Sequence, residues 1–281
     1  VINLCPGNYT VNVSDLAGCS GNNAVTINPQ IPIIIDLTTS DLSCNGVCNG
    51  SASVNPTGGL APYDIQWNGG GFVTGDNILP NLCAGNYTVD IRDANGCITS
   101  QAFVITEPTP LTTTSTGTNL SCFNICNGTA ITNPFGGTTP YIVTWTGPNG
   151  PHNGASLTNL CAGTYIAEIT DDSWCTLQVT VIITETAPLD PNAQFTPITC
   201  NGLNDGTAIS IPTGGTPNYS YSWSGPGGPY NTQSIGPLAS GQYIVTVTDF
   251  NGCIGLDTVN LANPPALNVN ASATNASCGS I

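Results

Sequence analysis

The sequence predicts an all-β protein made of tandem antiparallel β-sandwiches. Three observations predict this class: strings of residues recur every 78 positions, each 78-residue unit contains about seven short strand-like segments, and no segment has a helical period. The 33 glycines and 22 prolines, with abundant Thr, Asn, Val and Ile, suit short strands joined by tight turns.

Five columns of residues recur at the 78-residue spacing without insertion or deletion, which is the signature of a repeat protein. The columns are Cys44, Cys122, Cys200 and Cys278; Cys19, Cys97, Cys175 and Cys253; Trp67, Trp145 and Trp223; Tyr63, Tyr141 and Tyr219; and Tyr9, Tyr87, Tyr165 and Tyr243. The predicted domains are full repeats at 33–110, 111–188 and 189–266, the C-terminal part of a repeat at 1–32 and the start of a further repeat at 267–281. We therefore expect the chain to be a window on a longer array.

Residues 111–188 illustrate the strand pattern. The alternating run "LTTTSTGTNLS" precedes Cys122, "GTAITNP" follows it, and "YIVTW", "YIAEITD" and "CTLQVTVIITE" are separated by Gly/Pro turns and by the corner "LTNLCAGTY". This corner resembles an immunoglobulin-type tyrosine corner, in which the ring packs inward and the hydroxyl bonds back to the backbone. The expected sandwiches are therefore Ig-like, and their predicted core aromatics are Trp67, Trp145, Trp223, Tyr87, Tyr165 and Tyr243.

Charge and cysteine content restrict the possible partners and the compartment. Charged residues make up 6 % of the chain, and 16 acidic residues face a single cation, Arg92, which gives a net charge of −15. Such a surface repels nucleic acid and anionic lipid. No apolar stretch reaches about 18 residues and no signal peptide is present, so we expect a mature soluble segment without membrane insertion. Thirteen cysteines indicate disulfides in an extracellular or cell-surface location.

One pair of cysteine columns disappears together from the last full repeat. Asn204 stands where Cys48 and Cys126 are expected, and Ala239 stands where Cys83 and Cys161 are expected. Losing both partners avoids a reactive orphan thiol, so the change predicts disulfides Cys48–Cys83 and Cys126–Cys161.

The other two cysteine columns leave alternatives. Cys44 and Cys122 lie in the turn between the first two strands, whereas Cys175 and Cys253 follow the turn between the last two, at the opposite end of a sandwich roughly 26 Å long. Bonded cysteines need Cα atoms within about 7 Å, which favours bridges between successive repeats, Cys44–Cys175 and Cys122–Cys253. On this scheme Cys5, Cys19, Cys97, Cys200 and Cys278 would pair with residues of the array outside this window. A bond Cys44–Cys97 within one repeat and a bond Cys97–Cys122 across a linker remain open.

Catalysis and metal binding have little support in the sequence. With one histidine (His152, expected in an exposed loop), no lysine and cysteines in disulfides, we expect neither an enzyme nor a cofactor. Zinc would need clustered CxxC or Cys/His pairs, but the close pairs are CxxxC. Arg92 is expected to be a solvated strand residue. Weak calcium candidates are the turn aspartates Asp15, Asp93, Asp171, Asp172 and Asp249, although an Asp in this position more often caps its own turn.

The repeat string itself resembles a known family. "SCNGVCNGSASVNPTGGLAPYDIQW" and "LPNLCAGNYTVDIRDANGC" resemble the SprB repeat of Bacteroidetes surface proteins in C-x-G…G-x-A, G-G-x-x-P-Y-x-x-x-W, L-x-x-G-x-Y and D-x-N-G-C. Asn218 departs from the proline of "PY", and "DDSWC" at 171–175 departs from "DANGC". The resemblance implies very large surface or secreted proteins, exported by the type IX system, that serve in adhesion, gliding or filament formation.

Glycosylation is a further possibility. N-x-S/T sequons occur at Asn8, Asn49, Asn86 and Asn127. For the host that the resemblance suggests, the D-S/T-V match at Asp257–Val259 is more relevant, with Thr258 as the acceptor.

The expected function is structural: a segment of a stiff extracellular rod, filament or adhesin stalk. Its partners would be neighbouring repeats of the same chain and identical chains in a filament. The alternative is an array of binding modules for surface polysaccharide or a partner protein. Exposed loop aromatics would favour that alternative, and the candidates Phe72, Trp174 and Tyr230 differ between repeats.

Overall fold

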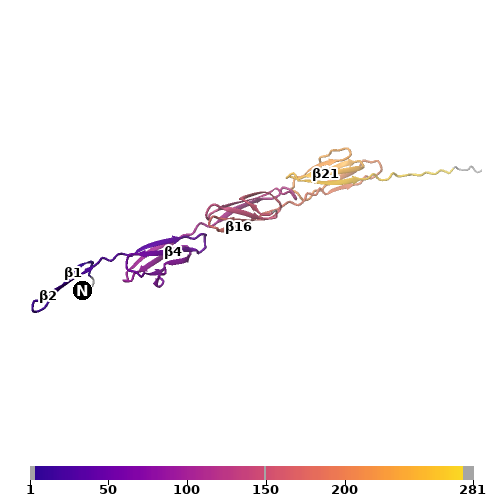
Figure 1. Cartoon of the computed structure of the whole chain (residues 1–281). Helices are drawn as coiled ribbons and strands as arrows, with labels where there is room; N and C mark the ends of the chain where they lie inside the picture. Colours follow the sequence, from indigo (N-terminus) through magenta and orange to yellow (C-terminus); the bar gives the residue numbers. More distant parts are fainter. Residues whose placement is uncertain (1–3, 149, 275–281) are drawn as a thin grey trace, which may run out of the picture. The chain divides into compact units, whose positions relative to one another are not determined.

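The computed structural model describes residues 4–148 and 150–274, and the regular secondary structure of these residues is β-strand (Figure 1). The predicted all-β class is confirmed. None of the described residues forms a helix long and apolar enough to span a membrane.

The chain divides into two compact units. Unit 1 holds the residues up to Thr112 together with Pro134–Ile142 and Ile169–Leu177. Unit 2 holds Thr113–Asn133, Val143–Glu168 and the residues from Gln178 onward. Because this division separates parts of 111–188, the repeat boundaries remain a prediction from the sequence.

Unit 1 contains a hairpin and a complete sandwich. The hairpin pairs β1 (Gly7–Ser14) with β2 (Ser20–Ile27). Residues 33–110 form a three-stranded sheet in the order β3-β4-β7 and a four-stranded sheet in the order β6-β5-β8-β9. The strands are β3 Ile34–Ser40, β4 Gly50–Thr57, β5 Asp64–Trp67, β6 Val73–Thr74, β7 Ile78–Leu82, β8 Gly85–Arg92 and β9 Ile98–Ile105. Lettered along the chain, the sheets are A-B-E and C′-C-F-G, which is the Ig-like arrangement.

Residues 111–188 repeat this arrangement. Their sheets have the orders β10-β11-β14 and β13-β12-β15-β16. The strands are β10 Thr112–Thr118, β11 Gly128–Phe135, β12 Ile142–Thr146, β13 His152–Asn153, β14 Ser156–Leu160, β15 Gly163–Thr170 and β16 Thr176–Ile183.

Unit 2 ends with a third sandwich, whose sheets have the orders β17-β18-β20 and β19-β21-β22. An isolated bridge between Trp223 and Tyr230 replaces the short C′ strand. The strands are β17 Ala193–Thr196, β18 Gly206–Ser210, β19 Ser220–Ser224, β20 Ser234–Leu238, β21 Gly241–Thr248 and β22 Ile254–Leu261.

The cores come from alternating residues of facing strands. In residues 33–110, Val54 of one sheet joins Ile65, Trp67 and Val89 of the other in a single buried cluster. In 189–266, Trp223 and Tyr243 are fully buried within an equivalent cluster. Apolar residues two positions apart share one face of a strand, so this alternation buries one face of each sheet against the other.

Glycine opens the second strand of each sandwich because the two sheets approach closely there. A Cβ on Gly50 would lie 2.8 Å from Ile105, and a Cβ on Gly128 would lie 2.7 Å from Ile183. A Cβ on the equivalent Gly206 would overlap Leu261. No side chain fits at these positions without displacing the core.

The tyrosine column does not pack uniformly. Tyr165 and Tyr243 are fully buried, whereas Tyr87 is only partly buried at the edge of its core. Gly147 presses on the Tyr165 ring so closely that a Cβ there would overlap the ring, but a Cβ on the matching Gly69 would meet nothing within 4 Å. Tyr87 instead stacks on Phe103 with ring centroids 5.5 Å apart.

Candidate functional site at the disulfide-linked turns

Four disulfides join cysteines within the described residues. Cys48–Cys83 and Cys126–Cys161 each span 35 residues, with Cα atoms 4.1 and 4.0 Å apart. Cys44–Cys175 and Cys122–Cys253 each span 131 residues, with Cα atoms 5.7 and 5.6 Å apart. The structure therefore forms the pairs that the sequence favours. It forms neither Cys44–Cys97 nor Cys97–Cys122. Cys5, Cys19, Cys97 and Cys200 are unbonded, and Cys278 lies outside the described residues.

One partner of each long-range disulfide lies in a tight turn that we call the Cys turn, residues 44–48 and 122–126. Residues 200–204 form the same turn around the unbonded Cys200. In the first Cys turn, the Gly46 N–H donates to Glu107 Oε2 at 2.8 Å, and Asn45 Nδ2 donates to the Pro108 carbonyl at 3.0 Å. Asn49 accepts from the Ser43 N–H at 3.1 Å and donates to its hydroxyl at 2.7 Å. These hydrogen bonds hold the turn from both sides, in addition to its disulfides.

The other Cys turns use the same supports. In the second, the Asn124 N–H donates to Glu185. Asn127 accepts from the Ser121 N–H and donates to the Ser121 hydroxyl. In the third, Asp205 accepts from the Thr199 N–H and hydroxyl. The sequence marks Asn49 and Asn127 only as glycosylation sequons, and these structural roles were not predicted from it. The signal that could have revealed them is that Asn49, Asn127 and Asp205 form a column of oxygen acceptors at 78-residue spacing. Glu107, Glu185 and Asn263 form a second such column.

The second partner follows a turn capped by a buried aspartate. Asp171 Oδ1 accepts from the Cys175 N–H at 2.8 Å, and its Oδ2 accepts from the Thr138 N–H at 2.9 Å. Asp93 and Asp249 make the corresponding bonds to the N–H groups of Cys97 and Cys253, both at 2.8 Å. Both carboxylate oxygens are thus engaged by backbone donors, the arrangement of a turn cap.

The same aspartates are calcium candidates, but their carboxylate oxygens already accept hydrogen bonds from backbone N–H groups. Asp172 is exposed, and the residues described here contain no group of three or more His, Cys, Asp or Glu side chains placed to hold a metal. Asp15 of the hairpin is also a turn cap, since it accepts from the Ala17 and Cys19 N–H groups.

The cap makes stability depend on pH. Burial raises the pKa of Asp93, but hydrogen bonds from the backbone N–H groups of Cys97, Leu60 and Asn95 outweigh it and lower this pKa. A lowered folded-state pKa contributes stability that is complete above the unfolded value of about 3.9 and is lost as pH falls through the folded value. We expect the free energy of unfolding of residues 33–110 to fall as the pH is lowered from about 5 to about 2.

Asp93→Asn tests the assignment by hydrogen exchange and mass spectrometry of peptides from β3 to β9 across this pH range, with each rate compared with the intrinsic rate at the same pH. The variant should be less stable at neutral pH, because an amide NH2 group would face a backbone donor, and its pH dependence should be flatter. The exposed Asp76→Asn is the matched control. An unchanged pH profile in Asp93→Asn would contradict the role of the cap.

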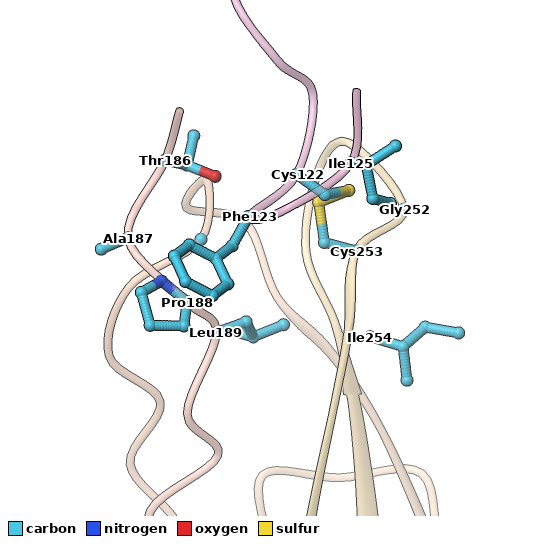
Figure 2. A pocket seen from close by; sticks show the side chains of 11 residues that line it. Cys122, Phe123, Ile125, Thr186, Ala187, Pro188, Leu189, Gly252, Cys253 and Ile254 are labelled. Atoms are coloured by element: carbon cyan, nitrogen blue, oxygen red, sulfur yellow. A yellow bond between two sulfur atoms is a disulfide. The ribbon is translucent and has the colours of Figure 1, made fainter. Parts of the chain in front are cut away.

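Grooves open beside both long-range disulfides. The groove at Cys122–Cys253 has a volume of about 380 Å³, and Figure 2 shows the Phe123 ring directed toward Pro188 near the bridge. Asn251 Nδ2 donates to the Ser121 carbonyl at 3.1 Å in the same region. The groove at Cys44–Cys175 has about 430 Å³ and is lined by Val47, Leu111 and Trp174, among others.

Trp174 is the most exposed of the three loop aromatics. Its side chain is 82 % exposed, and its φ of 66° occupies the turn position where Gly96 and Gly252 have φ of 83°. A bulky residue in this left-handed region is strained. Phe72 is half-buried beneath Arg92, and Tyr230 packs against its core while its hydroxyl donates to the Pro226 carbonyl at 3.0 Å.

Two expectations about single residues need correction. Arg92 is not merely solvated, because its guanidinium lies 2.8 Å from Asp64 and 4.4 Å from the Phe72 ring centroid. The Thr74 hydroxyl and Arg92 lower the pKa of Asp64. His152 is not an exposed loop residue: it is half-buried in β13, opposite Trp145, and its Nε2 has no hydrogen-bond partner among the described residues. For His152 the reason is the short strand β13, since two residues are too few to show a period. For Arg92 the reason is the pairing of β5 with β8, which places Asp64 opposite it.

Two glycosylation candidates, Thr258 and Asn8, are exposed strand residues. Thr258 is exposed on β22, where its N–H donates to Asp257 Oδ1 at 2.7 Å. Asn8 is exposed on β1 and accepts from the Thr26 hydroxyl at 2.6 Å. Modification at these residues remains a prediction.

Two stretches of the chain match a known family of repeats. The family model of the SprB repeat matches residues 37–72 and 192–228. These two stretches of the chain match the SprB repeat. The two matched stretches each contain a Cys turn and a core tryptophan, Trp67 or Trp223, so the SprB-repeat match falls on the features described above.

No curated protein matches this chain. Among solved structures, it is similar to Dpr2 Ig1-Ig2 in complex with DIP-Theta Ig1-Ig3, with 12 % identity, a TM-score of 0.32, and coverage of 82 % of this chain and 98 % of that chain. A Dscam structure on isoform specificity shares 13 % identity, with a TM-score of 0.26 and coverage of 90 % and 79 %. These scores are too low to carry an argument beyond the fold read from the strand order.

Proposed function

We propose that the chain is a structural segment of a long extracellular repeat protein, a stiff cell-surface stalk, rod or filament. The observation that carries this proposal is the pair of long-range disulfides. Cys44–Cys175 and Cys122–Cys253 have the same separation of 131 residues and link a Cys turn of one predicted repeat to the last turn of the next. Successive domains move relative to one another by default, and a covalent link at each junction would suppress that motion.

The chemistry of the chain supports this proposal over an enzyme. The buried aspartates are engaged by backbone amides, the long-range cysteines are bonded, and the formal charge of −15 comes with one cation. Disulfides of this kind persist outside the reducing cytosol. The family resemblance adds adhesion, gliding or filament formation on a Bacteroidetes cell, with export by the type IX system, as the proposed setting.

Removing one long-range disulfide tests the stalk function. Negative-stain electron microscopy and small-angle X-ray scattering would compare the wild-type chain with Cys44→Ser/Cys175→Ser. We expect a narrow distribution of end-to-end lengths in the wild type and a broad one in the variant. Cys126→Ser/Cys161→Ser is the matched control, because its bridge lies within residues 111–188. Equal distributions in the wild type and the long-range variant would refute the proposal.

Trp174 favours a second function, a binding module. An exposed tryptophan held in a strained conformation beside a groove is a candidate ligand contact. Since the chain has one cation and a charge of −15, a neutral polysaccharide would fit better than an acidic one.

Trp174→Gly separates binding from turn strain. We expect the variant to be more stable by about 0.5–1 kcal/mol in chemical denaturation, because glycine adopts a positive φ without strain. If Trp174 binds glycans, affinity electrophoresis in a neutral glucan gel would show retardation of the wild type but not of the variant. Equal mobility of the two proteins would remove the binding function at this residue.

A further inference from the structure

The two long-range disulfides differ in how deeply their cysteines are buried. Cys122 and Cys253 are 8 % and 9 % exposed, whereas Cys44 and Cys175 are only half-buried. Both bridges span 131 residues, so the length of the closed loop is not the cause of the difference. The side chains around each bridge are therefore the place to look for it.

Phe123 distinguishes the second bridge from the first. It follows Cys122 directly, and the matching positions in the other two Cys turns hold Asn45 and Asn201. The Phe123 ring points toward Pro188, and both residues line the groove beside the bridge (Figure 2). An aromatic ring thus lies beside the second bridge, where the other Cys turns carry a smaller, polar side chain.

The first bridge has no comparable cover. Asn45 lines its groove at the position that corresponds to Phe123. Trp174 lines the same groove, but it is 82 % exposed, and an indole with so few contacts shields little of the bridge. This agrees with the greater exposure of the cysteines in the first bridge.

Phenylalanine at position 123 gives up a hydrogen bond that the other Cys turns make. Asn45 Nδ2 donates to the Pro108 carbonyl at 3.0 Å, and Asn201 makes the matching bond at 2.6 Å. Thr186 is the residue that corresponds to Pro108, and the Phe123 side chain has no donor for its carbonyl. The Thr186 hydroxyl is also buried without a hydrogen-bond partner among the described residues. Because lost and unpaired hydrogen bonds are unfavourable, the ring serves a purpose other than holding the turn.

Access to the sulfur atoms decides how fast a disulfide is reduced. A thiolate has to reach one of the two sulfurs, so a side chain packed over them slows the reaction. The thiolate also loses hydration when it enters an apolar groove, which raises the barrier further. Exposed disulfides are accordingly the more labile ones.

We infer that Phe123 shields the Cys122–Cys253 disulfide, so that a small-molecule thiol reduces Cys44–Cys175 and leaves Cys122–Cys253 intact. One long-range link is then redox-sensitive and the other is resistant. This order of reduction holds whatever the chain does. That reduction would loosen a stalk at one link before the other rests on the proposed function.

The covalent step balances with a small dithiol such as dithiothreitol. Its thiolate attacks Sγ of Cys44 or Cys175, the protein S–S bond breaks, and a mixed disulfide forms. The second thiol of the reagent then closes a cyclic disulfide and releases the other cysteine. The protein gains two electrons and two protons, and the dithiol loses them.

Differential alkylation of the intact chain measures the order. Thiols present at the start are blocked with N-ethylmaleimide, which is then removed. Dithiothreitol is added under native conditions, and thiols released at set times are labelled with deuterated N-ethylmaleimide and located by mass spectrometry of peptic peptides. We expect Cys44–Cys175 to be reduced at least about tenfold faster than Cys122–Cys253. Equal rates or the reverse order would overturn the inference.

The variant Cys48→Asn/Cys83→Ala excludes an indirect cause. In the wild type, early reduction of the exposed Cys48–Cys83 bridge could loosen residues 33–110 and so expose Cys44. The variant has no such bridge to lose, and its two long-range links should be reduced in the same order. A loss of the order in this variant would contradict shielding.

Phe123→Asn tests the ring directly. Asparagine occupies the matching positions of the other Cys turns, so the variant should fold, and Cys122–Cys253 should be reduced about tenfold faster than in the wild type. Phe123→Leu, which keeps an apolar side chain without the ring, should give an intermediate rate. Phe135→Asn is the matched control, since Phe135 is 53 % exposed on β11 and does not line the groove.

Hydrogen exchange of peptides from β10 to β16 separates access from unfolding. Exchange in Phe123→Asn should equal that of the wild type while reduction of Cys122–Cys253 accelerates. An unchanged reduction rate, or the same acceleration in Phe135→Asn, would overturn the role of Phe123. The alkylation rates do not depend on molecular length. If the order is found but the partly reduced chain keeps the length distribution of the wild type, the stalk function fails and the shielding stands.

Discussion

Replacing Trp223 with alanine should lower the free energy of unfolding of residues 189–266 by about 3–5 kcal/mol, the cost typical of removing a buried tryptophan. The Trp223 side chain is fully buried, and it belongs to the cluster that contains Tyr243 and Val245. Its Nε1 donates to the Thr232 carbonyl at 3.0 Å. The substitution therefore leaves both a cavity between the two sheets and an unpaired carbonyl.

Hydrogen exchange followed by mass spectrometry measures this effect in the intact chain, where a single melting temperature would mix several sandwiches. Peptides from β18 to β22 should lose protection, whereas peptides from β3 to β9 should keep it. Phe250→Ala is the control, because this side chain is 70 % exposed and its removal should change stability by no more than about 0.5 kcal/mol. Equal loss of protection in both variants would mean that Trp223 is not central to the core.

The repeat period accounts for most of what can be predicted of the fold. A residue that recurs at the same place in every unit, such as Trp67, Trp145 or Trp223, occupies the same place in every sandwich, so its burial can be inferred without knowing the strand pairing. The alternation of apolar residues in "YIVTW" and "YIAEITD" indicates which strand faces are buried. Both inferences use patterns that recur in every full repeat.

Features outside the columns could not be predicted in this way. Tyr87 lies at the edge of its core because Gly69 leaves its ring uncovered, and it stacks on Phe103 where the other full repeats have valine. The strained backbone of Trp174 follows from a substitution at a single glycine position. Each feature depends on contacts of one particular side chain, on which the period carries no information.

One class of cysteine pair could be predicted from the repeat columns, and the other could not. The joint loss of two columns indicates one class of pair, because a disulfide needs both partners. For the other class the columns alone left three schemes, since every repeat carries both cysteines and nothing varies to separate them. A distance was needed, and the Cα separations of 5.7 and 5.6 Å in the structure supply it.

The double variant Cys48→Asn/Cys83→Ala gives residues 33–110 the side chains that Asn204 and Ala239 provide in 189–266. The Cys48–Cys83 bridge spans 35 residues, and removing it should lower the free energy of unfolding by about 3–4 kcal/mol in the chain-entropy model. The variant should still fold. The hydrogen bonds of Glu107 and Asn49 hold the Cys turn, and Tyr87 still donates to the carbonyl of residue 83.

Hydrogen exchange of β3 to β9, compared with β17 to β22 in the same molecule, measures this cost against an internal reference. Cys48→Asn alone is the second variant. It should lose more exchange protection than the double variant, because its remaining Cys83 thiol is free to form a non-native disulfide with Cys97. If the double variant kept the exchange protection of the wild type, the bridge would contribute nothing to folding. The paired loss of both cysteines in 189–266 would then reflect only the avoidance of a free thiol. If it lost about 3–4 kcal/mol, the third sandwich must recover that stability from its own contacts. Tyr243, whose hydroxyl donates to the Ala239 carbonyl and lies 3.4 Å from that of Pro226, is the first place to look.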